Sequence, residues 1–248
     1  MMNRNPIFLQ ELGEIRRIFV RFAGACVVIA FTMFLGTPPL AMRLFAYMSE
    51  SLIPSGVSLV ALGPFSSFIA PFSVALMVSL IVSFPYLLFS LLRYLLPALF
   101  PAERRLILRL FLFSIILFFS GCAFSYFFLI PYTFTILYSF AGPLGVTPFF
   151  SLDTFVATVF GLTVSSGLCF LIPIYMLALS AIGLVSARAW REHWRGAVLI
   201  VILLSAILTP DGSGVTMVLL SVPLLFLYSV GALSSERREA SRARLSNN

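Results

Sequence analysis

Two short stretches of the sequence place carboxylates close to arginines, and these are residue types that could bind a charged ligand. Glu14 precedes Arg16 and Arg17, and Glu103 directly precedes Arg104 and Arg105. A carboxylate can hold a guanidinium group through two parallel charge-assisted hydrogen bonds. Each stretch therefore has the chemistry needed to bind a guanidinium group.

A plainer interpretation of the same residues is also open. Glu103 could pair with Arg104 or Arg105, or it could favour the start of a helix through the helix dipole. Exposed ion pairs of this kind are common and contribute little to stability. From the residues alone we favour this plainer interpretation.

No other part of the sequence shows a pattern typical of catalysis or metal binding. His193 is the single histidine and lies in an arginine-rich stretch, so no second histidine could share a metal with it. Cys26, Cys122 and Cys169 each lie inside an apolar segment, at spacings that fit neither a metal site nor a disulfide framework. A Gly-rich phosphate loop, a catalytic triad pattern and paired carboxylates are all missing. We therefore predict that the protein is not an enzyme and uses no cofactor or metal.

The elements that carry these residues are long apolar segments. Of the 248 residues, 60% are hydrophobic and 10% are charged, and the mean hydropathy is +1.08, whereas a soluble domain has roughly 25% charged residues. About 20 helical residues cross a hydrocarbon layer of about 30 Å, and open strands would leave backbone groups unpaired in lipid. We predict an all-α polytopic membrane protein with a single domain over residues 1–233. Its six transmembrane helices cover approximately residues 20–36, 68–99, 106–133, 154–185, 196–209 and 214–233.

The arginines predict how these helices cross the membrane. The chain has 16 basic residues, all of them Arg. Fifteen lie beside the same ends of the predicted spans, and only Arg43 lies on the other side. The positive-inside rule then places both termini in the cytoplasm. We predict that the protein lies in the cell inner membrane and crosses it several times. The polar tail, residues 234–248, is predicted to be a disordered cytoplasmic end near anionic lipid.

Prolines and span lengths predict the shape of the helices. Pro71, Pro85 and Pro97 in the second span, Pro131 in the third and Pro173 in the fourth are expected to cause kinks, because proline removes a backbone donor. The fifth span is so short that the bilayer must thin locally or flanking residues must be pulled inward. Long bent helices beside short ones suggest a concave wall. The spans contain no Asp, Glu, Lys or His, which disfavours an ion or proton relay.

Several stretches resemble one known family. Pro85-Tyr86-Leu87-Leu88-Phe89, followed by the run from Tyr94 through Pro97 to Glu103-Arg104-Arg105, closely resembles the second span and first cytoplasmic loop of the TatC family. Gly121, Phe124-Ser125-Tyr126-Phe127 and Pro131 resemble its third-helix signature. Leu208-Thr209-Pro210-Asp211 resembles the family's turn between the fifth and sixth helices. Glu14-Ile15-Arg16 resembles the family's N-terminal Glu-Leu-Arg. These matches follow the order of the family.

The resemblance implies that the protein is the core receptor subunit of the twin-arginine protein translocase. Such proteins recognise signal peptides with two adjacent arginines. With single-span TatA-like and TatB-like subunits they move folded proteins across the membrane, driven by the proton-motive force. The resemblance implies self-association, contact with membrane lipids, no nucleic-acid partner, and six helices in a cupped, glove-like arrangement. It assigns signal-peptide binding to Glu14, Arg16, Tyr94, Glu103 and Arg104, and structural motifs to Pro85, Pro97, Tyr126, Pro131 and Asp211.

The chain also departs from the family pattern. Leu171 stands where the fourth helix usually carries Glu or Gln, and Glu11 replaces a His. Tyr94 stands where Phe is more usual, and Ser229 occupies a position that is often acidic. The loss of these polar groups leaves the docking of a signal peptide intact in principle. It affects the arrangement by which the family usually contacts a partner helix.

Two other function classes are open at this point. A small-solute transporter should show internal repeats, or interrupted helices with polar groups at mid-membrane, and no such repeat is visible. A divergent membrane scaffold without signal-peptide recognition would keep the topology but would not need Glu103.

Overall fold

The computed structural model describes residues 6–36, 39–54, 56–95, 104–139, 149–209 and 214–246. Nearly all of these residues are helical, as expected for an all-α membrane protein. The packing of the chain divides into two compact units. The first unit comprises Met1–Ser51 and Ala61–Ile115, and the second comprises Leu52–Val60 and Ile116–Asn248.

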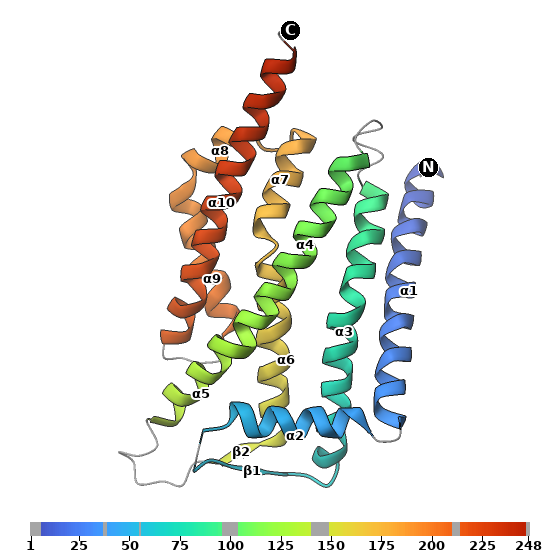
Figure 1. The fold of residues 1–248 in the computed structure, drawn as a ribbon, viewed down its shortest axis with the longest axis vertical. Helices are drawn as coiled ribbons and strands as arrows, with labels where there is room; N and C mark the ends of the chain where they lie inside the picture. Colours follow the sequence, from blue (N-terminus) through green and yellow to red (C-terminus); the bar gives the residue numbers. More distant parts are fainter. Residues whose placement is uncertain are drawn as a thin grey trace, which may run out of the picture. The chain divides into compact units, whose positions relative to one another are not determined.

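The first unit is built on two long antiparallel helices. α1 (Pro6–Leu35) lies beside α3 (Ser66–Leu95), as Figure 1 shows. Ala30 of α1 and Ala75 of α3 are buried in one apolar cluster with Ala41 of α2 (Leu40–Leu52). The Cys26 thiol donates to the backbone oxygen of Ser79 at 3.9 Å. Small side chains therefore bring the two backbones close together, as they do between helices in membranes. The first part of α4 (Arg104–Phe124) also belongs to this unit.

The second unit contains the remaining elements. After α4 come a π-helical turn, η1 (Ser125–Leu129), α5 (Ile130–Ser139), α6 (Leu152–Cys169), α7 (Ile172–Ile182), α8 (Ala187–Glu192), α9 (Trp194–Leu208) and α10 (Val215–Ser246). α10 packs on α7, α8 and α9. Two short strands, β1 (Ser58–Val60) and β2 (Phe149–Ser151), pair in parallel with Ser58 opposite Phe149.

The regular α-helix is interrupted near two of the prolines at which kinks were predicted, Pro131 and Pro173. Before Pro131 the chain forms η1, where the N–H of Ile130 bonds to the oxygen of Ser125 across a wider turn. Before Pro173 the helix stops after Cys169 and restarts as α7, with the proline in its first turn. A proline in the first turn costs no hydrogen bond, because its missing N–H would have no partner there. In α3, Pro71 and Pro85 lie inside one continuous helix.

Five of the six predicted spans coincide with long apolar helices. Within the described residues, the stretches long and apolar enough to cross a membrane are Gly13–Leu35, Ser66–Leu91, Arg109–Ser139, Leu152–Ser180 and Val215–Arg237. The predicted span 196–209 corresponds to α9, which has 15 residues. At 1.5 Å per residue α9 is only about 22 Å long, less than a hydrocarbon layer of about 30 Å. The predicted shortness of this segment is therefore confirmed.

Two features were not predicted from the sequence. The first is α2, a helix of 13 residues that is too short to cross a membrane. It has buried and exposed faces: Ala41 and Met48 are buried, whereas Arg43 and Tyr47 are exposed. The second is the β1–β2 pair, whose three-residue strands are too short to give a recognisable pattern.

α10 continues as a helix to Ser246, into the segment from Ser234 that was expected to be a disordered tail. The tail is rich in Glu, Arg and Ala, which are strong helix formers. Its beginning is also anchored by packing. The carboxylate of Glu236 pairs with Arg191 near the end of α8 at 3.4 Å, and Gly231 lies against Pro173 and Met176 of α7.

Glycines permit a very close crossing of α4 and α6 in the second unit. A Cβ atom on Gly121 would lie 2.8 Å from the backbone oxygen of Ser166, and one on Gly167 would lie 2.7 Å from the sulfur of Cys122. The hydroxyl of Ser166 donates to the backbone oxygen of Gly121 at 3.1 Å. The crossing therefore requires residues without a side chain at both positions.

We expect Gly167→Ala to destabilise the protein, because the added methyl group would clash with Cys122 and with the ring of Phe118. Overpacking of this kind typically costs about 1–3 kcal/mol. Gly161→Ala is a matched control on the same helix, since a Cβ there meets nothing within 4 Å, and alanine is favoured over glycine in helices by about 1 kcal/mol. Unfolding midpoints of the purified proteins in detergent should be lower for Gly167→Ala only. Equal midpoints for the two variants would contradict the close crossing.

Candidate functional site

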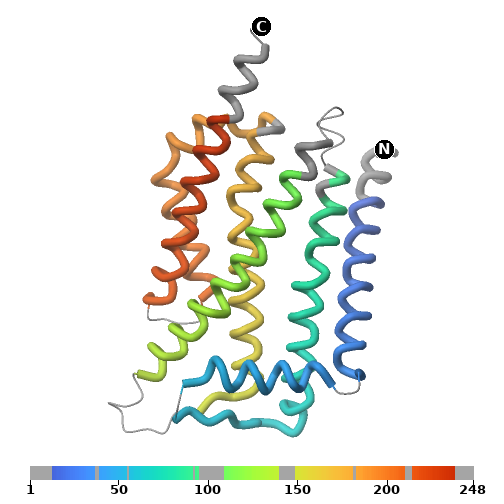
Figure 2. Tube along the Cα trace, viewed as in Figure 1, coloured from blue at the N-terminus to red at the C-terminus, as the bar shows by residue number. Residues whose placement is uncertain are grey.

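A cavity lies between the N-terminal half of α1 and the C-terminal half of α3, in the first unit. Figure 2 shows these two ends side by side. The cavity has a volume of about 560 Å³. Charged, hydroxyl-bearing and aromatic side chains surround it. Its lining residues are Glu14, Arg17, Ile18 and Arg21 of α1, and Tyr86, Phe89, Ser90, Arg93 and Tyr94 of α3.

The antiparallel register of α1 and α3 decides which residues meet in the cavity. Cys26 lies level with Ser79, as their hydrogen bond shows. Extending this register toward the start of α1 brings Glu14 level with Leu91. On each helix the lining residues recur at intervals of three and four, so they share one helix face.

The cavity carries more positive than negative charge. Among the described lining residues, Arg17, Arg21 and Arg93 contribute three guanidinium groups and Glu14 contributes one carboxylate, which together give a formal charge of +2. All four side chains are exposed. None of them forms a salt bridge with another described residue, and the salt bridges found among the described residues lie in the second unit. The lining is therefore suited to charged ligands.

Aromatic and hydroxyl groups form the wall that α3 contributes. The ring of Phe89 lies edge-on to that of Phe111 on α4, with 5.2 Å between ring centroids, and this contact joins the cavity wall to the next helix. Tyr86 and Tyr94 lie two turns apart on the same face, with Ser90 between them. Tyrosine rings of this kind are typical of the boundary between membrane and water.

The structure brings two of the five predicted signal-peptide residues together. Glu14 and Tyr94 line the cavity from opposite helices. Arg16 is exposed on α1 and does not line the cavity, whereas Arg17 does. Arg104 is the first residue of α4, and its side chain lies outside the described part of the chain. Glu103 also lies outside the described residues.

The predicted motif residues fall at bends or within helices. Pro85 lies inside α3, Tyr126 in η1 and Pro131 in the first turn of α5. The ring of Tyr126 packs edge-on against that of Phe127. Pro97 and Asp211 lie outside the described residues.

Sequence reasoning missed Arg17, Arg21 and Arg93 as lining residues. A signal was present: Glu14 and Arg21 are seven residues apart, as are Tyr86 and Arg93, and this spacing returns to the same helix face. The two faces could be matched only once the register of the two helices was known.

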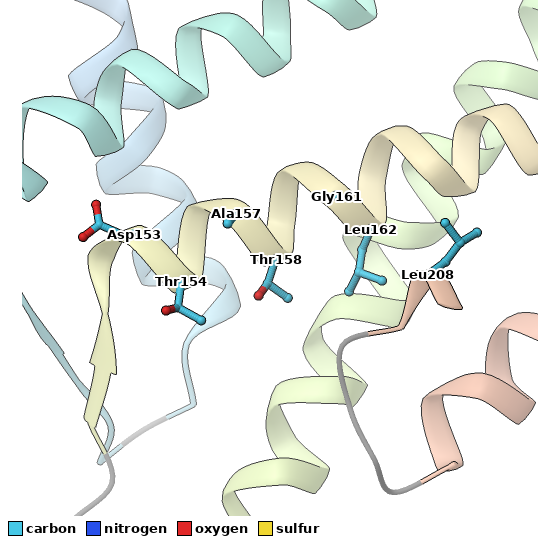
Figure 3. Close-up of a pocket in the computed structure, with 7 residues that line it drawn as sticks. All are labelled: Asp153, Thr154, Ala157, Thr158, Gly161, Leu162 and Leu208. Atoms are coloured by element: carbon cyan, nitrogen blue, oxygen red, sulfur yellow. The ribbon is translucent and has the colours of Figure 1, made fainter. Parts of the chain in front are cut away.

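A second hollow, of about 440 Å³, lies along α6 in the second unit. Figure 3 shows Thr154, Thr158 and Leu162 extending from one side of this helix, with Leu208 of α9 nearby. Leu171, which stands where the family usually has a polar residue, does not line this hollow. It is buried at the break between α6 and α7.

Hydrogen bonds hold the arginine-rich loop of the second unit. The indole N–H of Trp190 donates to the hydroxyl of Ser180 at 2.8 Å, and the hydroxyl of Tyr228 donates to the backbone oxygen of Trp190 at 2.5 Å. His193 is exposed, as predicted for a solvated loop residue, and its Nδ1 lies 3.0 Å from the backbone oxygen of Ala189. Over the described residues, no group of three His, Cys, Asp or Glu side chains could hold a metal ion.

Known proteins share both the sequence pattern and the fold. The family model for the Sec-independent protein translocase protein (TatC) matches residues 10–223. TatC from Cenarchaeum symbiosum is 36% identical over 200 residues, which cover 81% of this chain and 76% of that protein. TatC from Synechocystis is 34% identical over 223 residues, which cover 89% and 84%. A crystal structure of the twin-arginine translocase receptor TatC in DDM matches with a TM-score of 0.78 at 28% identity, over 91% of this chain and 99% of that one. The resemblance seen in the sequence is therefore confirmed, and the chain belongs to the TatC family of Sec-independent protein translocase proteins.

Proposed function

We propose that the chain is the receptor subunit of a twin-arginine protein translocase in the cell inner membrane, with both termini in the cytoplasm. It binds the paired arginines of a signal peptide. With TatA-like and TatB-like single-span subunits, it supports the export of folded proteins driven by the proton-motive force. The observation that carries this proposal is the TatC family match over residues 10–223.

Two further observations support a receptor role. A solved structure with the same fold is described as the twin-arginine translocase receptor. In this chain, Glu14 and Tyr94 line one cavity although they are far apart in the sequence. A carboxylate beside an aromatic ring suits a guanidinium group, which donates hydrogen bonds to the carboxylate and can lie over the face of the ring.

Signal recognition requires carboxylates, because the ligand carries two guanidinium groups. Glu14 provides one carboxylate in the cavity, and Glu103 is the proposed second. A hydrogen bond to a charged group contributes about 1.5–3 kcal/mol. The three arginines of the lining repel a cation that lacks such bonds, so binding depends on close bidentate contacts and not on general charge attraction.

We expect Glu103→Ala to reduce export of a reporter with a twin-arginine signal by about tenfold or more, because the loss of one charge-assisted contact corresponds to at least that factor. Export is measured in a deletion strain complemented with the variant. Glu14→Ala should also reduce export.

Glu50→Ala is the matched control for these variants, because Glu50 is an exposed carboxylate on α2 that does not line the cavity. It should export the reporter at the normal rate. Undiminished export by Glu103→Ala, at normal protein levels, would instead support a scaffold without signal recognition.

We also expect the purified protein in detergent to crosslink to a twin-arginine signal peptide much more than to the same peptide with two lysines. The ammonium group of lysine cannot make the two parallel hydrogen bonds that a guanidinium group makes to a carboxylate. The crosslinking yields are compared at equal peptide concentrations. Equal yields would mean that the protein recognises positive charge alone, and the receptor proposal would then be wrong.

A further inference from the structure

We propose that the cavity between α1 and α3 binds the phosphate group of an anionic glycerophospholipid from the membrane leaflet at this end of the helices. The proposal goes beyond signal recognition, because lipid binding requires no signal peptide and can be measured without one.

The charge of the lining points to an anionic ligand. Among the described lining residues, Arg17, Arg21 and Arg93 outnumber the one carboxylate, Glu14, and none of the three arginines forms a salt bridge with another described residue. Guanidinium groups that share a cavity repel one another. A phosphate group relieves this repulsion, and its oxygens match the planar fork of arginine.

The positions of the arginines along the helices fit a ligand at the membrane boundary. Arg17 and Arg21 are one turn apart on α1, about 6 Å along its axis, and Glu14 lies further out toward the helix start. In the antiparallel register, Arg21 faces the deeper part of the cavity beside Tyr86, whereas Arg93 lies near the level of Glu14. Hydroxyl groups of Tyr86 and Ser90 supply further donors for phosphate oxygens.

The surface beside the cavity favours a lipid over a free phosphate ion. Beyond Arg21, α1 exposes large apolar side chains, among them Val27, Val28 and Phe31, which are 60–63% exposed. Within the apolar stretch Gly13–Leu35, Ala30 alone is buried. Acyl chains attached to a bound phosphate can therefore continue along an apolar helix surface.

The test uses the full-length protein, purified and delipidated in a neutral detergent, and measures its unfolding midpoint during lipid titration. Dioleoylphosphatidylglycerol should raise the midpoint at a concentration about tenfold lower than dioleoylphosphatidylcholine does. In the Arg21→Gln/Arg93→Gln variant, the phosphatidylglycerol concentration needed for the same shift should rise by about tenfold, because two arginine contacts to an anionic headgroup are lost.

The matched control is Arg43→Gln/Arg195→Gln, which removes the same number of charges at exposed positions outside the cavity. Its response to phosphatidylglycerol should stay within about twofold of the unmodified protein. Should the cavity variant fail to fold, the single Arg93→Gln variant takes its place. Native mass spectrometry should then find fewer phosphatidylglycerol molecules retained on it than on the unmodified protein.

Several results would overturn the proposal. The lipid site is wrong if both lipids stabilise the protein equally. It is also wrong if Arg21→Gln/Arg93→Gln (or Arg93→Gln in its place) responds to phosphatidylglycerol like the unmodified protein. A control variant that loses this response to the same extent as the cavity variant would overturn the proposal as well. A titration with sodium phosphate distinguishes the source of the phosphate group. Full stabilisation by inorganic phosphate alone would mean that the cavity binds a free anion and not a lipid.

Discussion

A peptide backbone inside hydrocarbon has no water to bond with, and the rest of this structure depends on that constraint. Every N–H and C=O in the spans must find a partner within the protein, so the apolar runs fold as long helices. Several hydroxyl side chains in the helices also bond to the backbone. The hydroxyls of Ser114, Thr133 and Ser221 each donate to a backbone oxygen four residues earlier, which lets polar residues occupy helices without water.

Helices in lipid gain little from burying apolar surface, so their packing depends on close contact. In the first unit, Ala30 and Ala75 allow α1 and α3 to approach. In the second unit, Gly121 and Gly167 do the same for α4 and α6. Both units thus rely on small residues at helix crossings. Bends occur where proline interrupts the regular bonding pattern, as in the π-helical turn before Pro131.

The cavity lies where α1 and α3 leave the apolar part of their sequences, and this position explains its composition. Charged groups are costly at mid-membrane but tolerated near the boundary, where they reach water. Glu14 and three arginines can therefore share one surface. The same mixture gives the site two kinds of chemistry: a carboxylate that can accept from guanidinium groups, and guanidinium groups that can donate to phosphate. Membership of the TatC family gives the carboxylate chemistry a biological context, which is the proposed recognition of signal peptides.

The sequence by itself determined the all-α class, five long spans with a short α9, the irregular helix near Pro131 and Pro173, and the family, because each depends on local composition or on short motifs. It missed α2 and the β1–β2 pair, since a short amphipathic helix and three-residue strands are stabilised by distant parts of the chain. It singled out Glu14 and Tyr94 separately. Only the tertiary structure showed that they share a cavity with Arg17, Arg21 and Arg93. The reason is that the register between two antiparallel helices is fixed by packing between residues far apart in the sequence, which no local pattern specifies.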